Sequence, residues 1–414
     1  MQRPRKVLIL CNLPPRDWHV DNILAGHLAQ MGFDVRLTNL LPRPREHVLY
    51  FKPDIVIGPE ARCEFTVNFY NNCKSWGIWT VVRRCEGGTA QGAWDVMGQP
   101  EKDTVIGAWE YDVDMEMVWC EKFREIIAKN GYLPEDRYKV IGGVPFDPYF
   151  QMPHINRPNT RKNILVAPGW GHADTNPKYN VPEAPPDSPI HADAYGRHRR
   201  GREAWLNMID KLQKAVSPIW NVFLSLKVGE LPTEYQQRLG NRVQYVQPGQ
   251  SMREVLANMD FIIHPGSTLG LEAHLSGIPG QSFCGMYNQT TGYQYPHVHP
   301  DTEDVDELLK RVKETPRGKS NANVESVKEL EREFYGPIDG KAMERAAGFV
   351  AALPHREAKV PDVWPSENKE YTYPGVHKQQ ITWICEACQR PLFVDDPAAQ
   401  MVKCPSCGIS LSRR

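Results

Sequence analysis

Short apolar runs recur through the first 353 residues, and stretches with helical periodicity separate most of them. The run Lys6–Leu13 precedes a helical stretch from Asp21 to Met31, and the same alternation starts again at Asn163–Pro168. Strands that are separated by helices form a parallel sheet that is covered by helices on both faces. The sequence therefore predicts an α/β fold with two doubly wound, Rossmann-like domains.

The same patterns give the expected elements by residue range. Apolar runs predict strands at 6–13, 35–37, 54–58, 79–82, 138–141, 163–168, 221–226, 242–246 and 260–264. Helical patterns predict helices at 21–31, 68–76, 113–130, 201–217, 251–258, 305–314, 324–334 and 340–353. The expected units are an N-terminal domain at 1–160, a C-terminal domain with returning helices at 161–353, a Pro- and charge-rich linker at 354–380, and a small module at 381–414.

One strand–turn–helix unit suits a phosphate group. An apolar strand leads into the turn His264–Thr268, and a helix begins there with Glu272 in its second turn. Gly266 lets the backbone approach a ligand, Ser267 or Thr268 can cap the helix, and helix N–H groups favour an anion. Glu272 can then accept the hydroxyl groups of a ribose. The unit predicts a nucleotide site; the alternative is an ordinary structural βα turn.

Further donor-binding candidates follow other strands of the second half. Gly169 and Lys227 come directly after the strands expected at 163–168 and 221–226. The carboxyl ends of parallel strands are where α/β sheets bind ligands. His264 is a candidate phosphate contact, with a buried structural histidine as the alternative. The corresponding alternatives are a surface lysine for Lys227 and an exposed helix glutamate for Glu272.

Four segments resemble a known family. Lys52–Ile57, Ile164–Trp170, and His264–Ala273 with Gly277–Pro279 resemble strand and turn signatures of the bacterial surface-carbohydrate biosynthesis family. Ile141–Asp147 resembles its Gly-x-Pro-Arg-Phe-Asp signature at the interdomain junction, although the arginine is absent. This family neighbours Kdo-type and CDP-glycerol polymer transferases and has the GT-B glycosyltransferase architecture. The resemblance covers residues 5–350 and implies two facing domains, with a nucleotide-sugar as co-substrate of the C-terminal one.

Transfer of a sugar to a hydroxyl needs a base on the acceptor side. Glu86 precedes Gly87-Gly88 and resembles the acidic Glu-Gly loop of the family, with Arg84 and Cys85 in place of its leading acids. Asp17 and His19 follow the first strand and are the other catalytic candidates. Each of the three is alternatively a cap or turn residue.

Four cysteines near the C-terminus have the spacing of a zinc ribbon. Cys385 and Cys388 form one Cys-x2-Cys pair, and Cys404 and Cys407 form a second one after a spacer of 15 residues. Four thiolates bind zinc tetrahedrally and leave no open position on the metal. The sequence therefore predicts a structural zinc ion, while the other cysteines are scattered and expected to be reduced.

The acceptor is expected to be a polymer. The Pro-, Asp- and His-rich insertion at 171–201 is long for a loop and suits a lid or an acceptor-binding element. A surface polysaccharide or other glycan follows from the family resemblance. The alternative acceptor is hydroxymethylated phage DNA, suggested by the zinc ribbon and the basic cluster Arg197–Arg202. The balance of 49 basic and 50 acidic residues argues against nucleic acid.

Two other function classes stay open. A nucleotide-sugar 2-epimerase shares the two-domain fold and a similar turn with a downstream glutamate, and a non-catalytic binding module could use the ribbon for docking. No segment has the roughly 20 apolar residues needed to span a bilayer. The expectation is a soluble, cytoplasmic protein.

Overall fold

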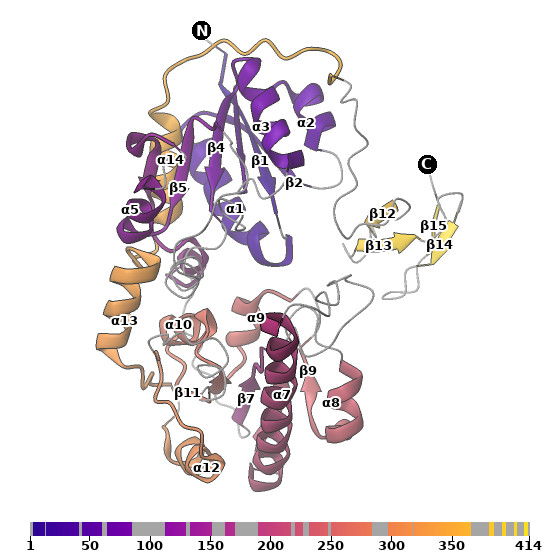
Figure 1. The fold of residues 1–414 in the computed structure, drawn as a ribbon, viewed down its shortest axis with the longest axis vertical. Coiled ribbons are helices and arrows are strands. Elements are labelled where there is room, and N and C mark those ends of the chain that lie inside the picture. The colour runs from indigo at the N-terminus through magenta and orange to yellow at the C-terminus, as the bar shows by residue number, and fades with distance from the viewer. Residues whose placement is uncertain are drawn as a thin grey trace.

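The computed structural model contains two α/β domains, one above the other in Figure 1, and two β-hairpins near the C-terminus. The structure describes residues 3–12, 14–40, 44–59, 64–84, 112–129, 133–150, 162–169, 189–216, 220–226, 232–246, 250–283, 297–316, 318–365, 381–384, 391–394, 401–403 and 410–412.

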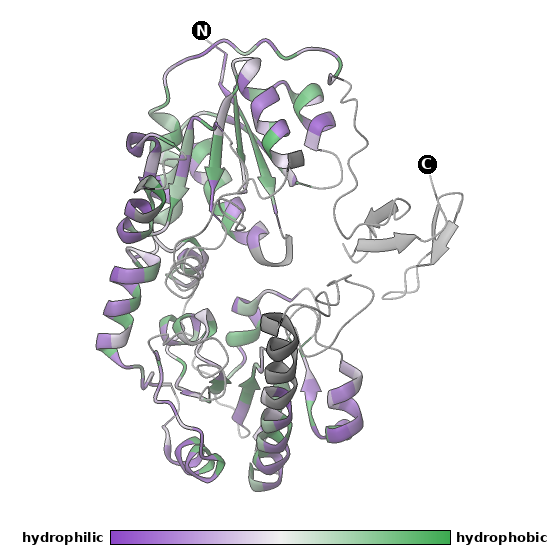
Figure 2. Ribbon diagram, viewed as in Figure 1, coloured by the Kyte–Doolittle hydropathy of each residue, from purple (hydrophilic) through white to green (hydrophobic). Residues whose placement is uncertain are grey.

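The first sheet has six parallel strands in the order β2-β1-β3-β4-β5-β6. Val7 and Ile9 of β1 pack into the core on one face of this sheet, and Leu8 and Leu10 into the core on the other. Burial on both faces explains why β1 and β3 are nearly continuous apolar runs, which appear green in Figure 2. The strands are β1 (Lys6–Cys11), β2 (Asp34–Asn39), β3 (Ile55–Gly58), β4 (Trp79–Arg83), β5 (Met115–Val118) and β6 (Tyr138–Val140).

Helices connect these strands, with the short 3-10 turns η1 (Glu135–Arg137) and η2 (Val144–Phe146) after α5. The outward faces of the helices are largely polar (Figure 2). The helices are α1 (Pro14–Gln30), α2 (Pro44–Phe51), α3 (Glu64–Ser75), α5 (Glu121–Lys129) and α6 (Asp147–Phe150).

The second sheet has five parallel strands in the order β11-β10-β7-β8-β9. The strand order reverses between β7 and β10, and such a switch point is where open α/β sheets bind ligands. The strands are β7 (Lys162–Val166), β8 (Trp220–Leu224), β9 (Gln244–Tyr245), β10 (Phe261–His264) and β11 (Gly280–Ser282). The helical elements are α7 (Pro189–Val216), α8 (Pro232–Leu239), η4 (Gly240–Arg242), α9 (Met252–Leu256), α10 (Thr268–Leu275) and α12 (Val305–Glu314).

The chain then returns to the first domain through α13 (Val324–Leu330), the π-helical turn η5 (Glu331–Tyr335) and α14 (Ala342–Ala351). In Figure 1, α14 lies beside the first sheet, and Met343, Ala346 and Val350 share a buried cluster with Val7 and Ile9. The last helix of the two-domain body is therefore part of the core of the N-terminal domain.

The α/β expectation with two Rossmann-like domains is confirmed, with differences in single elements. The single helix expected at 113–130 is wrong: β5 occupies its first part and α5 its second. Met115–Val118 is buried on both sides between β4 and β6, and so short an apolar run fits either structure. The helix expected at 21–31 begins at Pro14, because proline is tolerated in a first helical turn.

Two further differences concern segments expected to lack structure. The helix α7 begins at Pro189, so the end of the 171–201 insertion and its basic cluster belong to a helix. Residues 354–365, at the start of the expected linker, pack on the N-terminal domain. The Trp364 ring stacks on Phe69 at 5.5 Å between centroids, and the Lys359 N–H donates to the carbonyl oxygen of Trp76 at 2.7 Å.

The structure describes four short strands near the C-terminus. β12 (Ile381–Ile384) pairs antiparallel with β13 (Pro391–Val394), and β14 (Met401–Lys403) pairs antiparallel with β15 (Ser410–Ser412). Each Cys-x2-Cys pair therefore falls in the sequence between two paired strands. Among the described residues, no helix combines the length and the apolar character that crossing a membrane requires.

Candidate functional site

The predicted donor turn follows β10, at the switch point of the second sheet. Gly266 has φ of +70°, and Gly169, which follows β7, has φ of +80°. A β-carbon on Gly169 would lie 3.2 Å from Cγ of Pro265, so the segments after β7 and β10 touch. The structure thus brings Gly169 and the 264–268 turn together, as the donor-site prediction requires.

His264 supports this turn through hydrogen bonds from its buried ring. The backbone N–H groups of Gly266 and Ser267 donate to its Nδ1 at 3.1 and 3.4 Å, so the proton of the neutral ring is on Nε2. Nε2 then donates to Nδ1 of His299 at 3.0 Å. His264 is fully buried, and its ring occupies the space that a side chain on Gly270 would need. His264 therefore supports the turn from its buried side, as its structural alternative expects, while a contact with phosphate stays a prediction.

Two N–H groups of the turn already donate to His264, which leaves fewer N–H groups that could bind an anion. Gly266 and Ser267 cannot offer their N–H groups to a ligand while His264 accepts them. The Ser267 side chain makes no capping hydrogen bond to α10. The N–H groups of Thr268 and Leu269, in the first helical turn, are the ones left to face an anion.

The buried histidine pair predicts a loss of stability in mild acid. Burial lowers the pKa of His264 well below 6.5 and that of His299 to about 3. Below pH 6.5 the unfolded chain therefore binds more protons than the folded one. The stabilisation is complete above pH 6.5 and is lost as the pH falls. We expect a loss of about 1.4 kcal/mol per pH unit for each histidine, measured by urea unfolding at pH 7.5 and 5.0.

His299→Gln serves as the control for this pH dependence. A glutamine oxygen can still accept from His264, while the titration of His299 disappears, so the difference between pH 7.5 and 5.0 should shrink. An unchanged difference in this variant would assign the effect to other groups, such as His274, whose pKa burial also lowers.

Glu272 lies in α10, one turn after Thr268, and is held by two donors. The hydroxyl of Tyr149 donates to its Oε2, and Thr268 adds a second hydrogen bond. Burial raises the pKa of Glu272, and these hydrogen bonds partly counteract the rise. This carboxylate is half-buried and lies one turn beyond the N–H groups of Thr268 and Leu269, and its role as a ribose ligand stays a prediction.

Tyr149 connects this carboxylate to the crossover between the domains. It belongs to α6, whose first residue, Asp147, accepts the backbone N–H groups of Ala342 and Met343 at 3.1 and 2.7 Å. Asp147 thereby caps α14, where the chain returns to the N-terminal domain. The segment Ile141–Asp147, which the family resemblance assigns to the interdomain junction, thus joins the place where the chain leaves the N-terminal domain to the place where it returns.

The acceptor-side candidates fall at the carboxyl ends of β1 and β4. Asp17 and Asp21, one turn apart in α1, are both buried, and Asp21 pairs with Arg83 at 2.8 Å between Oδ1 and Nη2. Burial raises the pKa of Asp21, and the charge of Arg83 opposes this rise. Burial, followed by the charges of the two aspartates, also raises the pKa of the Cys11 thiol. The structure therefore places Asp17 in a buried group with Cys11, Asp21 and Arg83.

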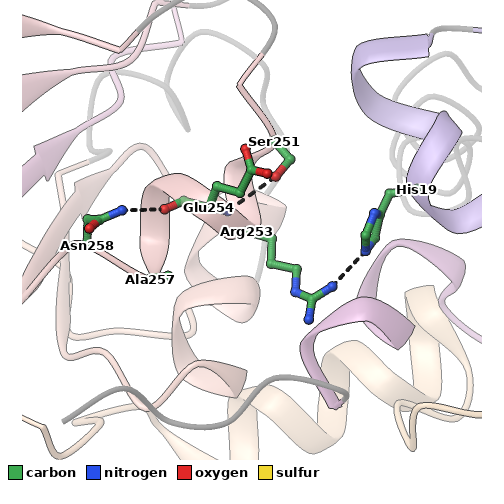
Figure 3. Close-up of a pocket in the computed structure, with 6 residues that line it drawn as sticks. All are labelled: His19, Ser251, Arg253, Glu254, Ala257 and Asn258. Atoms are coloured by element: carbon green, nitrogen blue, oxygen red, sulfur yellow. Dashed lines mark hydrogen bonds between the residues drawn. The ribbon is translucent and has the colours of Figure 1, made fainter.

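His19 faces the second domain. Nη1 of Arg253, in α9, donates to its Nε2 at 2.7 Å, which joins α1 to the second domain (Figure 3). Burial, and then the charge of Arg253, lower the pKa of His19. These two side chains, with Ser251, Glu254, Ala257 and Asn258, line a pocket of about 350 Å³.

Several predicted site residues lie outside the described residues. They are the catalytic candidate Glu86, the donor-side Lys227, and the four zinc ligands Cys385, Cys388, Cys404 and Cys407. Within the described part of the chain, no group of three or more His, Cys, Asp or Glu side chains is arranged to hold a metal ion. The predictions for these residues stay predictions.

Comparison with known proteins identifies the fold. No family model matches the sequence, and no curated protein sequence matches it. Among solved structures, a UDP-GlcNAc 2-epimerase from Methanocaldococcus jannaschii, in complex with UDP-GlcNAc and UDP, has a TM-score of 0.50 at 12% identity, over 84% of this chain and 99% of its own. The UDP-GlcNAc 2-epimerase of Neisseria meningitidis, bound to UDP-GlcNAc, has a TM-score of 0.50 at 13% identity, over 84% and 100%.

The wall teichoic acid polymerase TagF also has a TM-score of 0.50, at 13% identity, over 85% of this chain and 89% of its own. The chain has the GT-B fold. At these identities the similarity establishes the fold alone.

In this GT-B chain, the structure shows contacts that sequence reasoning missed. Tyr149, Asp21, Arg83 and Arg253 were not among the candidates. Asp21 had a usable signal, because it is four residues after Asp17 and shares a helix face with it. The other three meet their partners through tertiary contacts that no local pattern records.

Proposed function

We propose that the protein is a nucleotide-sugar-dependent glycosyltransferase. It moves a sugar from the donor to a hydroxyl of a large acceptor, a surface polysaccharide or another glycan. The observation that carries the proposal is Glu272, a half-buried carboxylate held one turn beyond the N–H groups of Thr268 and Leu269, at the switch point of the second sheet. This arrangement suits the ribose and phosphate of one nucleotide.

The proposed reaction uses both domains. An acceptor oxygen attacks the anomeric carbon of the sugar, and the bond from that carbon to the phosphate oxygen breaks. Asp17 receives the hydroxyl proton, and the N–H groups at the start of α10 stabilise the phosphate that leaves. Glu86 stays a second candidate for the base, and Lys227 stays a candidate ligand of the phosphate.

Nucleotide binding tests the donor site directly. We expect one of UDP, CMP, GDP, CDP and TDP at millimolar concentration to raise the unfolding temperature. A ligand at 100 times its Kd adds about 2.7 kcal/mol, which corresponds to a shift of several degrees. The shift should disappear in Glu272→Gln, because a ribose hydroxyl loses its charged acceptor.

The control for this experiment is Glu254→Gln. Glu254 is an exposed glutamate in α9 of the same domain, and its replacement should leave the shift in place. No shift with any of the five nucleotides would contradict the proposal and favour a non-catalytic binding module.

A nucleotide-sugar 2-epimerase is the second candidate. The similarity to two UDP-GlcNAc 2-epimerases favours this candidate, because it covers 99% and 100% of the epimerase chains. The two activities separate by product: an epimerase releases an epimerised sugar without any acceptor, whereas a transferase needs one. Incubation with UDP-GlcNAc alone, followed by mass spectrometry and NMR of the sugar, distinguishes them.

The nature of the acceptor is tested in the same way. A glycan acceptor should gain the mass of one or more sugars when incubated with the donor. Hydroxymethylcytosine DNA is the alternative acceptor, and digestion to nucleosides would show the added sugar there. Sugar on the DNA, and none on glycans, would overturn the glycan assignment.

We propose a structural zinc ion for the C-terminal hairpins. In the sequence, one Cys-x2-Cys pair stands between the paired strands β12 and β13 and the other between the paired strands β14 and β15, which supports two knuckles around one metal. We expect one zinc per chain by elemental analysis, and its loss in Cys385→Ser with Cys404→Ser. Because this module is separate from the two sheets, nucleotide binding should survive the loss. Absence of zinc from the unsubstituted protein would contradict the assignment.

A further inference from the structure

Arg253 reaches from the donor domain across to the N-terminal domain. Its Nη1 donates to Nε2 of His19 at 2.7 Å, and both side chains line the 350 Å³ pocket. In Figure 3, Arg253 points toward His19, while Glu254, the next residue along α9, extends toward Ser251. The guanidinium and its neighbouring carboxylate therefore point in different directions.

The partner of Arg253 is unusual for an arginine of this domain. Arg238, Arg242 and Arg311 pair with carboxylates at 2.8 Å or less, and the ion pairs of the described residues include none with Arg253. Its hydrogen-bond acceptor is an imidazole nitrogen, because a guanidinium can only donate, and burial together with the charge of Arg253 lowers the pKa of this histidine. A half-buried guanidinium beside a cavity, with a neutral acceptor, favours replacement of that acceptor by an anion.

Arg253 also lies beside the proposed donor site. Its charge acts on the hydroxyl of Tyr149, and this hydroxyl donates to Glu272. The helix α6, which carries Tyr149, contacts both α1 and α10. The cation, the ribose-binding carboxylate and the histidine thus form one connected group across the cleft.

We propose that Arg253 binds a phosphate group of the nucleotide, and that His19 is the place-holder that keeps the guanidinium in position until the nucleotide arrives. The inference rests on the proposed function and adds a phosphate ligand to it. Binding exchanges a neutral nitrogen acceptor for a phosphate oxygen, and it releases the contact between α1 and α9. His19 is then an acceptor that competes with the phosphate for Arg253, in place of the catalytic role predicted for it.

Titration calorimetry with UDP and uridine, and with CMP and cytidine as a second pair, tests the inference. We expect Arg253→Gln to weaken nucleotide binding about 10- to 100-fold, because a hydrogen bond between two charged groups is lost. The affinity for the nucleosides, which have no phosphate, should not change. His19→Ala should tighten nucleotide binding about fivefold, since no hydrogen bond has to be broken first.

Two further variants keep the experiment interpretable. Arg253→Lys retains the charge without the fork of donors, so its affinity should fall between those of Arg253→Gln and the unsubstituted protein. Arg238→Gln removes an exposed arginine of the same domain that pairs with Glu203, and it should bind nucleotides normally. Unfolding temperatures without nucleotide identify any variant that does not fold.

The outcomes separate the inference from the proposed function. Equal losses for UDP and uridine in Arg253→Gln would overturn the phosphate contact, and weaker binding in His19→Ala would overturn the place-holder. Nucleotide binding that needs Glu272 and is indifferent to Arg253 would sink this inference alone. If the unsubstituted protein binds neither UDP nor CMP, and no other nucleotide shifts its unfolding temperature, both fail.

Discussion

Gly336→Ala is expected to lower the free energy of unfolding by about 3–5 kcal/mol. Gly336 follows η5, with φ of +64° and ψ of −161°, a conformation that side-chain-bearing residues avoid. An added β-carbon would lie 2.0 Å from the carbonyl oxygen of Trp119. That oxygen already accepts the N–H of Gly142 at 3.1 Å, so it cannot move without losing this hydrogen bond between the segments that follow β5 and β6. Urea unfolding, followed by tryptophan fluorescence, measures the change.

Gly348→Ala is the matched control for this prediction. Gly348 is exposed inside α14, and a β-carbon there has no atom within 4 Å. Alanine should therefore stabilise the helix by about 0.5–1 kcal/mol. Equal effects of the two substitutions would show that the close approach of Gly336 to Trp119 is not a constraint on the fold.

Asp17→Asn is expected to lower the turnover of the nucleotide-sugar by about 10²–10⁴-fold. An amide cannot accept the proton of the acceptor hydroxyl, and it keeps the size of the carboxyl group in a buried position. The proposed nucleotide contacts are in the other domain, so the Kd for the nucleotide should stay unchanged. Steady-state kinetics, together with calorimetry on the same variant, separates the two quantities.

The matched control is Asp34→Asn. Asp34 is an exposed aspartate at the start of β2, at the opposite end of the sheet strands from Asp17, and its replacement should leave turnover unchanged. Asp17→Glu keeps a proton acceptor and should recover part of the activity. Full turnover in Asp17→Asn would exclude Asp17 as the base and direct attention to Glu86.

The proposed acid–base group illustrates how far local sequence reaches. The position of Asp17 after the first strand is visible in the sequence, because parallel strands present their carboxyl ends at one edge of the sheet. Its surroundings are not visible, since Arg83 is contributed by β4 and approaches through sheet pairing across many residues. The sequence therefore supports the choice of Asp17, while the charged groups around it are brought there by the fold.

The turn His264–Thr268 also combines a feature that the local sequence predicts with one that depends on a distant residue. The order strand, glycine turn, helix and glutamate was predictable, because each step is encoded within a few residues. The orientation of His264 was not, because it depends on His299, which lies 35 positions further along the chain. Burial of this pair shows that His264 supports the turn, a contact that the local sequence does not record.

By itself, the sequence determined the α/β class, the two-domain division and most element positions, with α12 at its expected bounds of Val305–Glu314. These features depend on periodicity, on glycine conformations and on caps, such as Asp304 accepting the N–H groups of Asp306 and Glu307. The tertiary structure alone decided that α14 completes the N-terminal core, that Tyr149 holds Glu272, and that Arg253 meets His19. The physical reason is that local patterns record hydrogen bonds between near neighbours, whereas these contacts form only when distant apolar faces are buried together.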